Sequence, residues 1–110
     1  MASVDALKAT LKRLENERLA VLTQLDDISQ DSAEHRLVLK NLDKIPDDRR
    51  CYRILGGIAV EKTVHEIKPD LNAHATKLDE YKVKLNSQLE LLNSEIVKVK
   101  TSLEHPAETS

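Results

Sequence analysis

The only two glycines of this 110-residue chain, Gly56 and Gly57, stand side by side near its middle. Apolar, β-prone runs flank them at residues 51–55 and 58–60. Two such runs separated by Gly-Gly predict a β-hairpin with a two-residue primed turn, because both turn positions need positive φ and glycine adopts it freely. We therefore predict a hairpin over about residues 50–62.

The two-residue turn also sets the register of the predicted hairpin. The expected pairs are Leu55 with Ile58, Arg53 with Val60 and Cys51 with Lys62 on one face, and Ile54 with Ala59 and Tyr52 with Glu61 on the other. Both faces are partly apolar. A lone two-stranded hairpin is marginal in water and exposes two unpaired edges. We therefore predict that it joins strands of other chains through Cys51, Tyr52, Arg53, Ile54, Leu55, Gly56, Gly57, Ile58, Ala59 and Val60.

The composition indicates long helices rather than a conventional globular core. The chain has no Trp, no Phe and two Tyr, and 33% of its residues are charged. A formal net charge of −2, with both signs interspersed, does not indicate nucleic-acid binding. The single cysteine fits a reducing compartment, and no apolar run is long enough for a signal peptide or a membrane span. We expect a soluble intracellular protein with neither nucleic acid nor membrane as a partner.

The segment before the hairpin repeats with the period of a coiled coil. Apolar residues fill nine of twelve positions at alternating spacings of three and four: Val4, Leu7, Leu11, Leu14, Arg18, Val21, Leu25, Ile28, Ser32, His35, Leu39 and Leu42. Ser3 is a suitable N-cap, and Pro46 cannot continue a helix. These features predict a first helix over about residues 4–44.

A second seam of the same kind follows the hairpin. It comprises Leu71, Ala75, Leu78, Lys82, Leu85, Leu89, Leu92, Ile96, Val99 and Leu103. Thr63 and Glu66 have the spacing of a capping box, which predicts a helix over about 64–104 with a frayed tail at 105–110. Pro69 predicts either a kink or a restart of the helix with the proline in its first turn.

Two helices of similar length on either side of a hairpin predict a mainly α fold, in which they form an antiparallel coiled coil within one domain, 1–110. A long parallel coiled coil with a partner is the competing geometry. Matching the two seams allows residue numbers that sum to 110, which pairs Leu7 with Leu103. A sum of 117 places His35 beside Lys82 and lets the first leucines project beyond the second helix. The pattern leaves both registers open.

The chain shows no constellation of residues that indicates catalysis. Its four histidines do not have the spacing of a metal site: His35, His65, His74 and His105. The glycine pair lies in no phosphate-binding pattern. We predict no catalytic, cofactor-binding or metal site and no enzyme activity. At a seam position His35 is either a pH sensor or, as is more common, a tolerated polar layer.

A distinctive run, CYRILGGIAVEKTVHEIKP, covers the hairpin and the start of the second helix. It resembles the β-type subunits of the prefoldin family, and among them the eukaryotic subunit 2 group. The matching residues are Cys51, Tyr52, Arg53, Gly56, Gly57, Val60, Glu61, Thr63, Val64, Glu66 and Pro69. Ala59 departs from the pattern, which usually has a larger aliphatic residue there, and this predicts looser packing of that strand.

The resemblance implies a heterohexamer of two α-type and four β-type subunits, whose hairpins join into a double β-barrel from which coiled coils extend. The tips of the coiled coils would hold non-native proteins, notably actin and tubulin, and deliver them to the cytosolic chaperonin without ATP or any other cofactor. On this implication we expect a client-binding tip made of Val4, Leu7, Leu11, Val99 and Leu103.

Two other interpretations remain open. A structural coiled-coil scaffold or tether would share the two seams, but it gives no reason for a hairpin with two apolar faces. A subunit of a prefoldin-like complex with another role would share both the two seams and the hairpin with two apolar faces.

Overall fold

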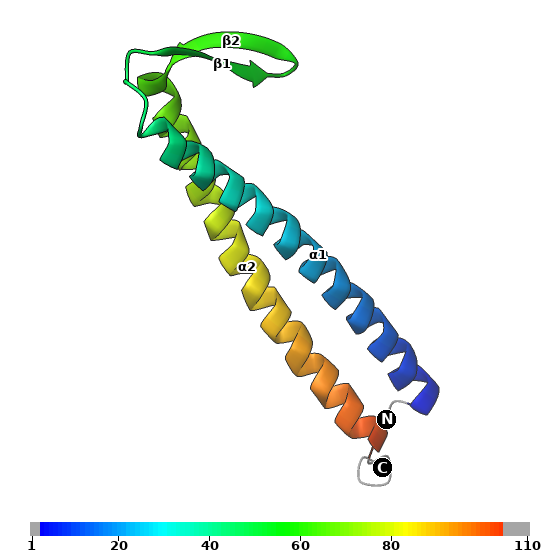
Figure 1. The fold of residues 1–110 in the computed structure, drawn as a ribbon. Helices are drawn as coiled ribbons and strands as arrows, with labels where there is room; N and C mark the ends of the chain where they lie inside the picture. The colour runs from blue at the N-terminus through cyan, green and yellow to red at the C-terminus, as the bar shows by residue number, and fades with distance from the viewer. Residues whose placement is uncertain (1–2, 105–110) are drawn as a thin grey trace. The chain divides into compact units, whose positions relative to one another are not determined.

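The computed structural model describes residues 3–104 of the chain, which form two long helices and one hairpin (Figure 1). Helix α1 spans Val4–Leu42, strand β1 spans Arg50–Leu55, strand β2 spans Ile58–Thr63 and helix α2 spans Val64–Glu104. The predicted mainly α class with a single antiparallel hairpin is confirmed. The frayed tail expected at 105–110 lies outside the described residues.

By their internal contacts the residues group into two compact units. The hairpin unit, residues 28–81, contains the end of α1, both strands and the start of α2. The terminal unit combines residues 1–27 with residues 82–110, so each unit brings a segment of α1 together with a segment of α2. This grouping is the one that an antiparallel pair of helices produces. That the whole chain is one domain stays a prediction.

The hairpin forms as the glycine pair predicts. Its register pairs Leu55 with Ile58 next to the turn, and every expected pair beyond them is confirmed. Gly56 has a φ of 57° and Gly57 a φ of 83°, so both occupy the left-handed region that a primed two-residue turn requires. The turn chemistry alone therefore fixed the alignment of two six-residue strands.

Helix α2 begins directly at the end of β2, and its first turn is fully capped. The Thr63 N–H donates to Glu66 Oε1 at 3.2 Å, and the Glu66 N–H donates to Thr63 Oγ1 at 3.3 Å. This reciprocal pair confirms the predicted capping box. The N–H groups of Val64 and His65 donate to carbonyls of the joint at residues 43–49, each at 3.0 Å. The first four N–H groups of a helix have no acceptor within the helix. At the start of α2 all four are hydrogen-bonded to other groups.

Pro69 lies inside α2, five residues after its start, and the helix is continuous through it. The expected restart with Pro69 in the first turn is therefore wrong, because the caps at Thr63 and Val64 already fix the start of the helix. The proline ring removes the bond that the His65 carbonyl would otherwise accept. A kink at this point, the other alternative, stays a prediction.

The ends of α1 follow from its caps. The Ala6 N–H donates to Ser3 Oγ at 3.0 Å, which confirms Ser3 as the N-cap. At the other end, the Ile45 N–H donates to the Leu42 carbonyl three residues back at 3.0 Å. Such tighter bonds end the α-helical pattern before Pro46 is reached. For this reason α1 ends at Leu42 and not near residue 44 as predicted.

The two predicted seams form the buried faces of the helices. Every seam position of α2 is buried or half-buried, and in α1 only Val4 and Arg18 are exposed. In the terminal unit the buried apolar residues are Leu14, Val21, Leu85, Leu92 and Ile96, and in the hairpin unit they are Val64, Ile67 and Ala75. Leu14 and Val64 are each only 1% exposed. The spacing therefore identified the buried residues of the terminal unit and Ala75 of the hairpin unit, whereas Val64 and Ile67 precede the second predicted seam and were missed.

Contacts within the hairpin unit select one of the two registers. The buried Ser32 hydroxyl donates to Asp79 Oδ1 at 2.9 Å, and Asp79 also accepts from Arg36. The rings of His35 and His74 lie 6.0 Å apart between their centroids. The residue numbers add to 111 for Ser32 with Asp79 and to 109 for His35 with His74, which fits the register with a sum of 110. Within this unit the alternative sum of 117 is therefore wrong.

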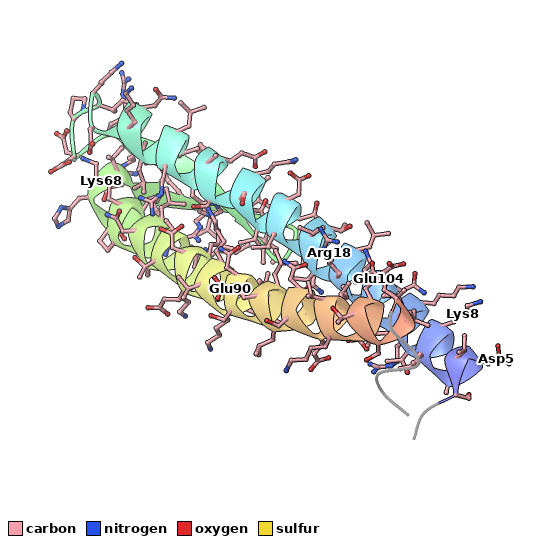
Figure 2. All side chains as sticks on the ribbon, turned by 90° about the horizontal axis from the view of Figure 1, so that it is seen from below. Asp5, Lys8, Arg18, Lys68, Glu90 and Glu104 are labelled. Carbon is pink, nitrogen blue, oxygen red and sulfur yellow. The ribbon has the colours of Figure 1, made fainter. Side chains whose placement is uncertain are left out.

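The remaining faces of both helices carry many charged residues, such as Lys8 on α1 and Glu90 on α2 (Figure 2), interspersed with exposed aliphatic residues such as Leu91. The Arg13–Glu17 ion pair, at 2.8 Å, joins neighbouring turns and is exposed on both sides. Exposed pairs of this kind add only a few tenths of a kcal/mol. The charges of the helices thus keep the surface solvated and do not by themselves build a site.

The capping box gives a first prediction. Thr63→Ala is expected to destabilise the chain by about 1 kcal/mol at neutral pH, measured by thermal unfolding, because the N-cap oxygen is lost. Hydrogen bonds from Thr63 lower the pKa of Glu66 below its ordinary value of 4.5. The stability that these bonds to the Glu66 carboxylate contribute is present above pH 4.5 and is lost as the pH falls through the lowered pKa. The difference in stability between Thr63→Ala and the unchanged protein should therefore become smaller in acid. Thr63→Ser, which keeps the oxygen, should behave like the unchanged protein.

Candidate functional site

The hairpin packs one face against the helices and leaves the other open. On the packed face Cys51, Arg53 and Val60 are half-buried. On the opposite face Tyr52 is 73% exposed and Ile54 is 76% exposed. Two large apolar side chains on one small open face form a surface that is costly to leave in water.

Ion pairs to α2 fix the hairpin on its packed face. Arg53 Nη1 lies 3.0 Å from Asp70 Oδ2, and Lys62 Nζ lies 3.8 Å from the same oxygen. The Arg53 side chain is only 17% exposed, so its aliphatic stem packs while its charge is paired. Both strands are thus tied to one carboxylate in the second turn of α2.

A second ionic cluster holds the joint between α1 and β1. Lys68 Nζ lies 3.3 Å from Asp47 Oδ1 and 3.4 Å from Asp43 Oδ1. The hydrogen bond to Asp47 is the main cause that raises the pKa of Lys68 above its ordinary value of 10.5. The ammonium therefore stays charged and bridges the joint to α2 at neutral pH.

The turn end of the hairpin is apolar and open on both faces. Leu55 is 44% exposed and Ile58 is 68% exposed, although they belong to the face that packs farther along the strands. Ala59 is exposed on the other face. Because Ala59 is exposed, contacts within the described residues do not test the looser packing predicted for this strand, which stays a prediction.

The strand edges offer unpaired peptide groups. In a two-residue hairpin the pair next to the turn, Leu55 and Ile58, is hydrogen-bonded, and bonded and non-bonded pairs then alternate. Tyr52 and Ile54 on β1 therefore direct their N–H and C=O groups outward, as do Ala59 and Glu61 on β2. The sheet has two strands only within the described residues, so both edges lack a neighbour there.

An apolar groove runs along the outer edge of β1. Its volume is about 420 Å³, and it is lined by Val38 and Leu42 of α1, by Ile67 and Leu71 of α2, and by Cys51, Tyr52, Arg53 and Ile54 of β1. Four consecutive β1 residues line it and no residue of β2 does, which places it beside the free edge of β1. We call this surface the β1 groove.

The side of β2 is polar by contrast. A smaller hollow there, of about 160 Å³, is lined by Arg50, Glu61, Lys62, Thr63 and Glu66. Arg50 Nη1 and Glu61 Oε1 form an ion pair at 3.3 Å across the strands. The outward N–H of Thr63 is already bonded to Glu66. The two edges of the hairpin thus differ in chemistry.

The residues expected to form a client-binding tip all lie in the terminal unit. Val4 is 46% exposed, whereas Leu7, Leu11, Val99 and Leu103 are half-buried. The leucines of α1 therefore pack at least partly and do not project freely. What remains open at this end is a set of partly covered aliphatic side chains.

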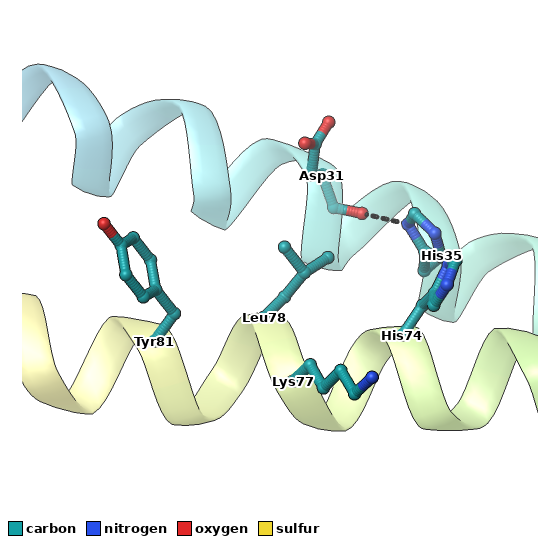
Figure 3. A pocket seen from close by; sticks show the side chains of 6 residues that line it. All are labelled: Asp31, His35, His74, Lys77, Leu78 and Tyr81. Carbon is teal, nitrogen blue, oxygen red and sulfur yellow. Dashed lines mark hydrogen bonds between the residues drawn. The ribbon is translucent and has the colours of Figure 1, made fainter.

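Two histidines share an open pocket in the hairpin unit. It is lined by Asp31, His35, His74, Lys77, Leu78 and Tyr81 (Figure 3). His35 Nδ1 lies 2.8 Å from the main-chain oxygen of Asp31, which orients the ring. A half-buried imidazole with a fixed hydrogen bond is a satisfied polar layer between helices. Whether His35 also senses pH stays a prediction.

Residues 3–104 contain neither a candidate metal site nor a candidate membrane span. In this range no group of three or more His, Cys, Asp or Glu side chains is arranged to hold a metal ion. No helix there is both long and apolar enough to cross a membrane.

Sequence reasoning missed part of the β1 groove. Val38 belongs to neither seam, and Ile67 precedes the second seam, yet both line the groove. The sequence contained a signal that could have identified Val38 and Ile67, because each is an apolar residue beside a helical seam and close in sequence to the hairpin. The strand residues that line the groove had all been assigned to assembly.

Comparisons with known proteins agree with this architecture. The model of a family described as prefoldin subunit matches residues 5–108. The chain is 29% identical over 94 residues to prefoldin subunit 2 of Homo sapiens and of Rattus norvegicus, covering 86% of this chain and 61% of each relative. It is 33% identical over 69 residues to a probable prefoldin subunit 2 of Drosophila melanogaster, covering 63% of this chain and 48% of that relative. The chain thus spans about three fifths or less of the length of these relatives.

Among solved structures, the fold is similar to the crystal structure of the prefoldin beta subunit from Thermococcus strain KS-1. The TM-score is 0.85 at 19% sequence identity, and the match covers 94% of this chain and 90% of that one. At this identity the likeness concerns the fold.

Proposed function

This chain belongs to the prefoldin subunit family, and from that premise we propose that it is a β-type subunit of a heterohexameric chaperone of the cytosol. In this proposal the hairpin joins other α-type and β-type prefoldin subunits, and the helices extend as an arm that captures non-native proteins. The chain carries out no catalysis and uses no ATP or other cofactor.

The observation that carries the proposal is the open hairpin. Tyr52 and Ile54 are about three-quarters exposed, and the outward peptide groups of both strands have no neighbouring strand within the described chain. Added strands would bury these side chains and pair these groups together. A coiled-coil tether needs no such surface, which favours a subunit that assembles through its hairpin.

Client capture is proposed for the far end of the helices, in the terminal unit. Val4, Leu7, Leu11, Val99 and Leu103 supply partly exposed aliphatic side chains on neighbouring segments of two helices. Each arm would bind an unfolded chain weakly, and several arms of one hexamer would hold it by avidity. Actin and tubulin are the proposed clients, and the cytosolic chaperonin is the proposed recipient.

Mixing the purified chain with a purified α-type prefoldin subunit tests the assembly. Native mass spectrometry should show a hexamer of two α-type and four copies of this chain. An elongated dimer of this chain that ignores the α-type subunit would instead support the tether. The measurement therefore separates the two classes of function directly.

A truncation tests the capture step. Deleting residues 1–12 should leave the hexamer intact, because the hairpin unit starts at residue 28. It should raise the hexamer concentration needed to suppress aggregation of denatured actin by roughly fivefold, since the avidity of the arms falls. Leu91→Ser, which changes a 67% exposed leucine elsewhere in the terminal unit, serves as the control. Unchanged suppression by the truncated hexamer would refute the tip assignment while leaving assembly untouched.

A further inference from the structure

Apolar burial along the two seams does not by itself select the register of the helices. A sum of 110 pairs Leu39 with Leu71, whereas a sum of 117 would pair it with Leu78. Three more apolar seam residues of α1 likewise meet an apolar seam residue of α2 with either sum: Leu14, Val21 and Leu25. Because the hydrophobic effect is non-directional, it distinguishes the two alignments only weakly.

One polar layer in the hairpin unit is directional. Ser32 occupies a seam position, is 4% exposed, and its hydroxyl donates to Asp79 Oδ1 at 2.9 Å. Arg36, one turn farther along α1, donates to Asp79 Oδ2. A single carboxylate of α2 thus binds two successive turns of α1, and bonds to an ionised acceptor are stronger than those between neutral groups. We call Ser32, Arg36 and Asp79 the polar layer.

The same carboxylate penalises the alternative register. A shift of one heptad would bring Leu39 to the place of Ser32, and Asp43 to the place of Arg36, beside Asp79. The carboxylate would then lose both donors and face an aliphatic side chain and a second carboxylate. The polar layer therefore favours the register of the hairpin unit and disfavours the slipped one.

Contacts of the joint between α1 and β1 agree with this register but do not enforce it by themselves. Lys68 binds Asp43 and Asp47 there. A shift of one heptad moves a helix along its axis by about 10.5 Å, at 1.5 Å per residue. Residues 43–49 span roughly 23 Å when extended, so the joint is long enough to follow such a shift.

We propose that the polar layer is the register lock of the two helices, which prevents a slip by one heptad that the apolar seams would tolerate. A buried polar group has this role in other coiled coils, where it fixes register at some cost in stability. The lock also matters at the start of α1. In the slipped register Leu7 and Leu11 would have no partner on α2, which ends at Glu104, and would lose their cover. The inference concerns the chain by itself and does not depend on the proposed assembly.

Two distances measured by pulsed electron paramagnetic resonance test the lock. Nitroxide labels are attached in a Cys51→Ser background at exposed positions of the hairpin unit, as Glu34→Cys with Thr76→Cys or as Lys40→Cys with Lys77→Cys. The numbers of the first pair sum to 110 and those of the second to 117, so each pair is level in one register only. A slip therefore lengthens the first distance and shortens the second, through an axial shift of about 10.5 Å.

Asp79→Leu is expected to give a second population, roughly a fifth of the molecules or more, with the first distance longer and the second shorter. Asp79→Asn, which keeps an oxygen for Ser32, should restore most of the single population. Glu80→Leu removes the same charge from the neighbouring exposed position of α2 and should keep the original distances. Lys68→Ala, which releases the joint, should keep them as well.

The outcomes separate a register lock from a contact that only adds stability. Unchanged distances in Asp79→Leu would overturn the proposal, and so would a slip in Lys68→Ala alone, which would place the lock in the joint. Lengthening of both distances in Asp79→Leu would also overturn it, because the helices would then separate and not slip. Should Asp79→Leu lose helix content by far-UV circular dichroism, Ser32→Ala combined with Arg36→Ala removes the lock from the side of α1 and must give the same slip.

Discussion

Replacing Leu14 by alanine is expected to lower the free energy of unfolding by about 2–5 kcal/mol. Leu14 is 1% exposed and is the most completely buried side chain of the terminal unit. Removing most of it forfeits the transfer free energy of the lost methyl and methylene groups and leaves a cavity that neighbouring side chains fill only in part. Urea unfolding followed by far-UV circular dichroism measures the difference.

Leu19→Ala is the matched control for this substitution. It makes the same chemical change in the same helix at a side chain that is 64% exposed. Surface substitutions of this kind usually change stability by no more than about 0.5 kcal/mol. If the two variants were destabilised equally, the face of α1 that carries Leu14 would not be the packed one.

Replacing Gly56 by valine is expected to weaken subunit binding about tenfold. Gly56 has a φ of 57°, and a left-handed conformation costs an L-residue about 1–2 kcal/mol, more when the side chain is β-branched. A Cβ atom at this position would meet nothing within 4 Å. The cost is therefore one of backbone conformation and not of collision. Because a two-stranded hairpin is marginal by itself, the strain should shift it away from the form that docks.

Gly56→Asn provides the control, because asparagine tolerates the left-handed region and Asn-Gly is a favoured primed turn. It is expected to bind an α-type prefoldin subunit as the unchanged chain does. Should both variants lose binding to the same extent, the polar turn itself would be an interface and the conformational explanation would fail.

Local chemistry made the hairpin and the helix starts predictable. A two-residue turn at Gly56 and Gly57 leaves a single way to align the strands, so the whole ladder followed from two residues. The capping box at Thr63 and Glu66 needs only residues that are close in sequence. The seams were predictable because burial on one side of a helix repeats with the helical period.

Features that depend on distant residues were not predictable in the same way. Two seams fit each other equally well in two registers, and contacts such as Ser32 with Asp79, far apart in sequence, decide between them. The packed face of the hairpin was ambiguous because both faces carry apolar residues. Arg53 lies on the packed face, where Asp70, distant in sequence, pairs with it. The β1 groove joins two helices and a strand, so no single stretch of sequence reveals it.

The junctions on the two sides of the hairpin differ in length. No residue separates β2 from α2, and the first turn of α2 is fixed by side-chain and main-chain bonds. Residues 43–49 separate α1 from β1 and include two turns. A load placed on the hairpin by a docked neighbour would therefore pass directly into the start of α2. The joint before β1 is bonded to that same turn through Val64, His65 and Lys68, so the load would reach α1 by way of α2.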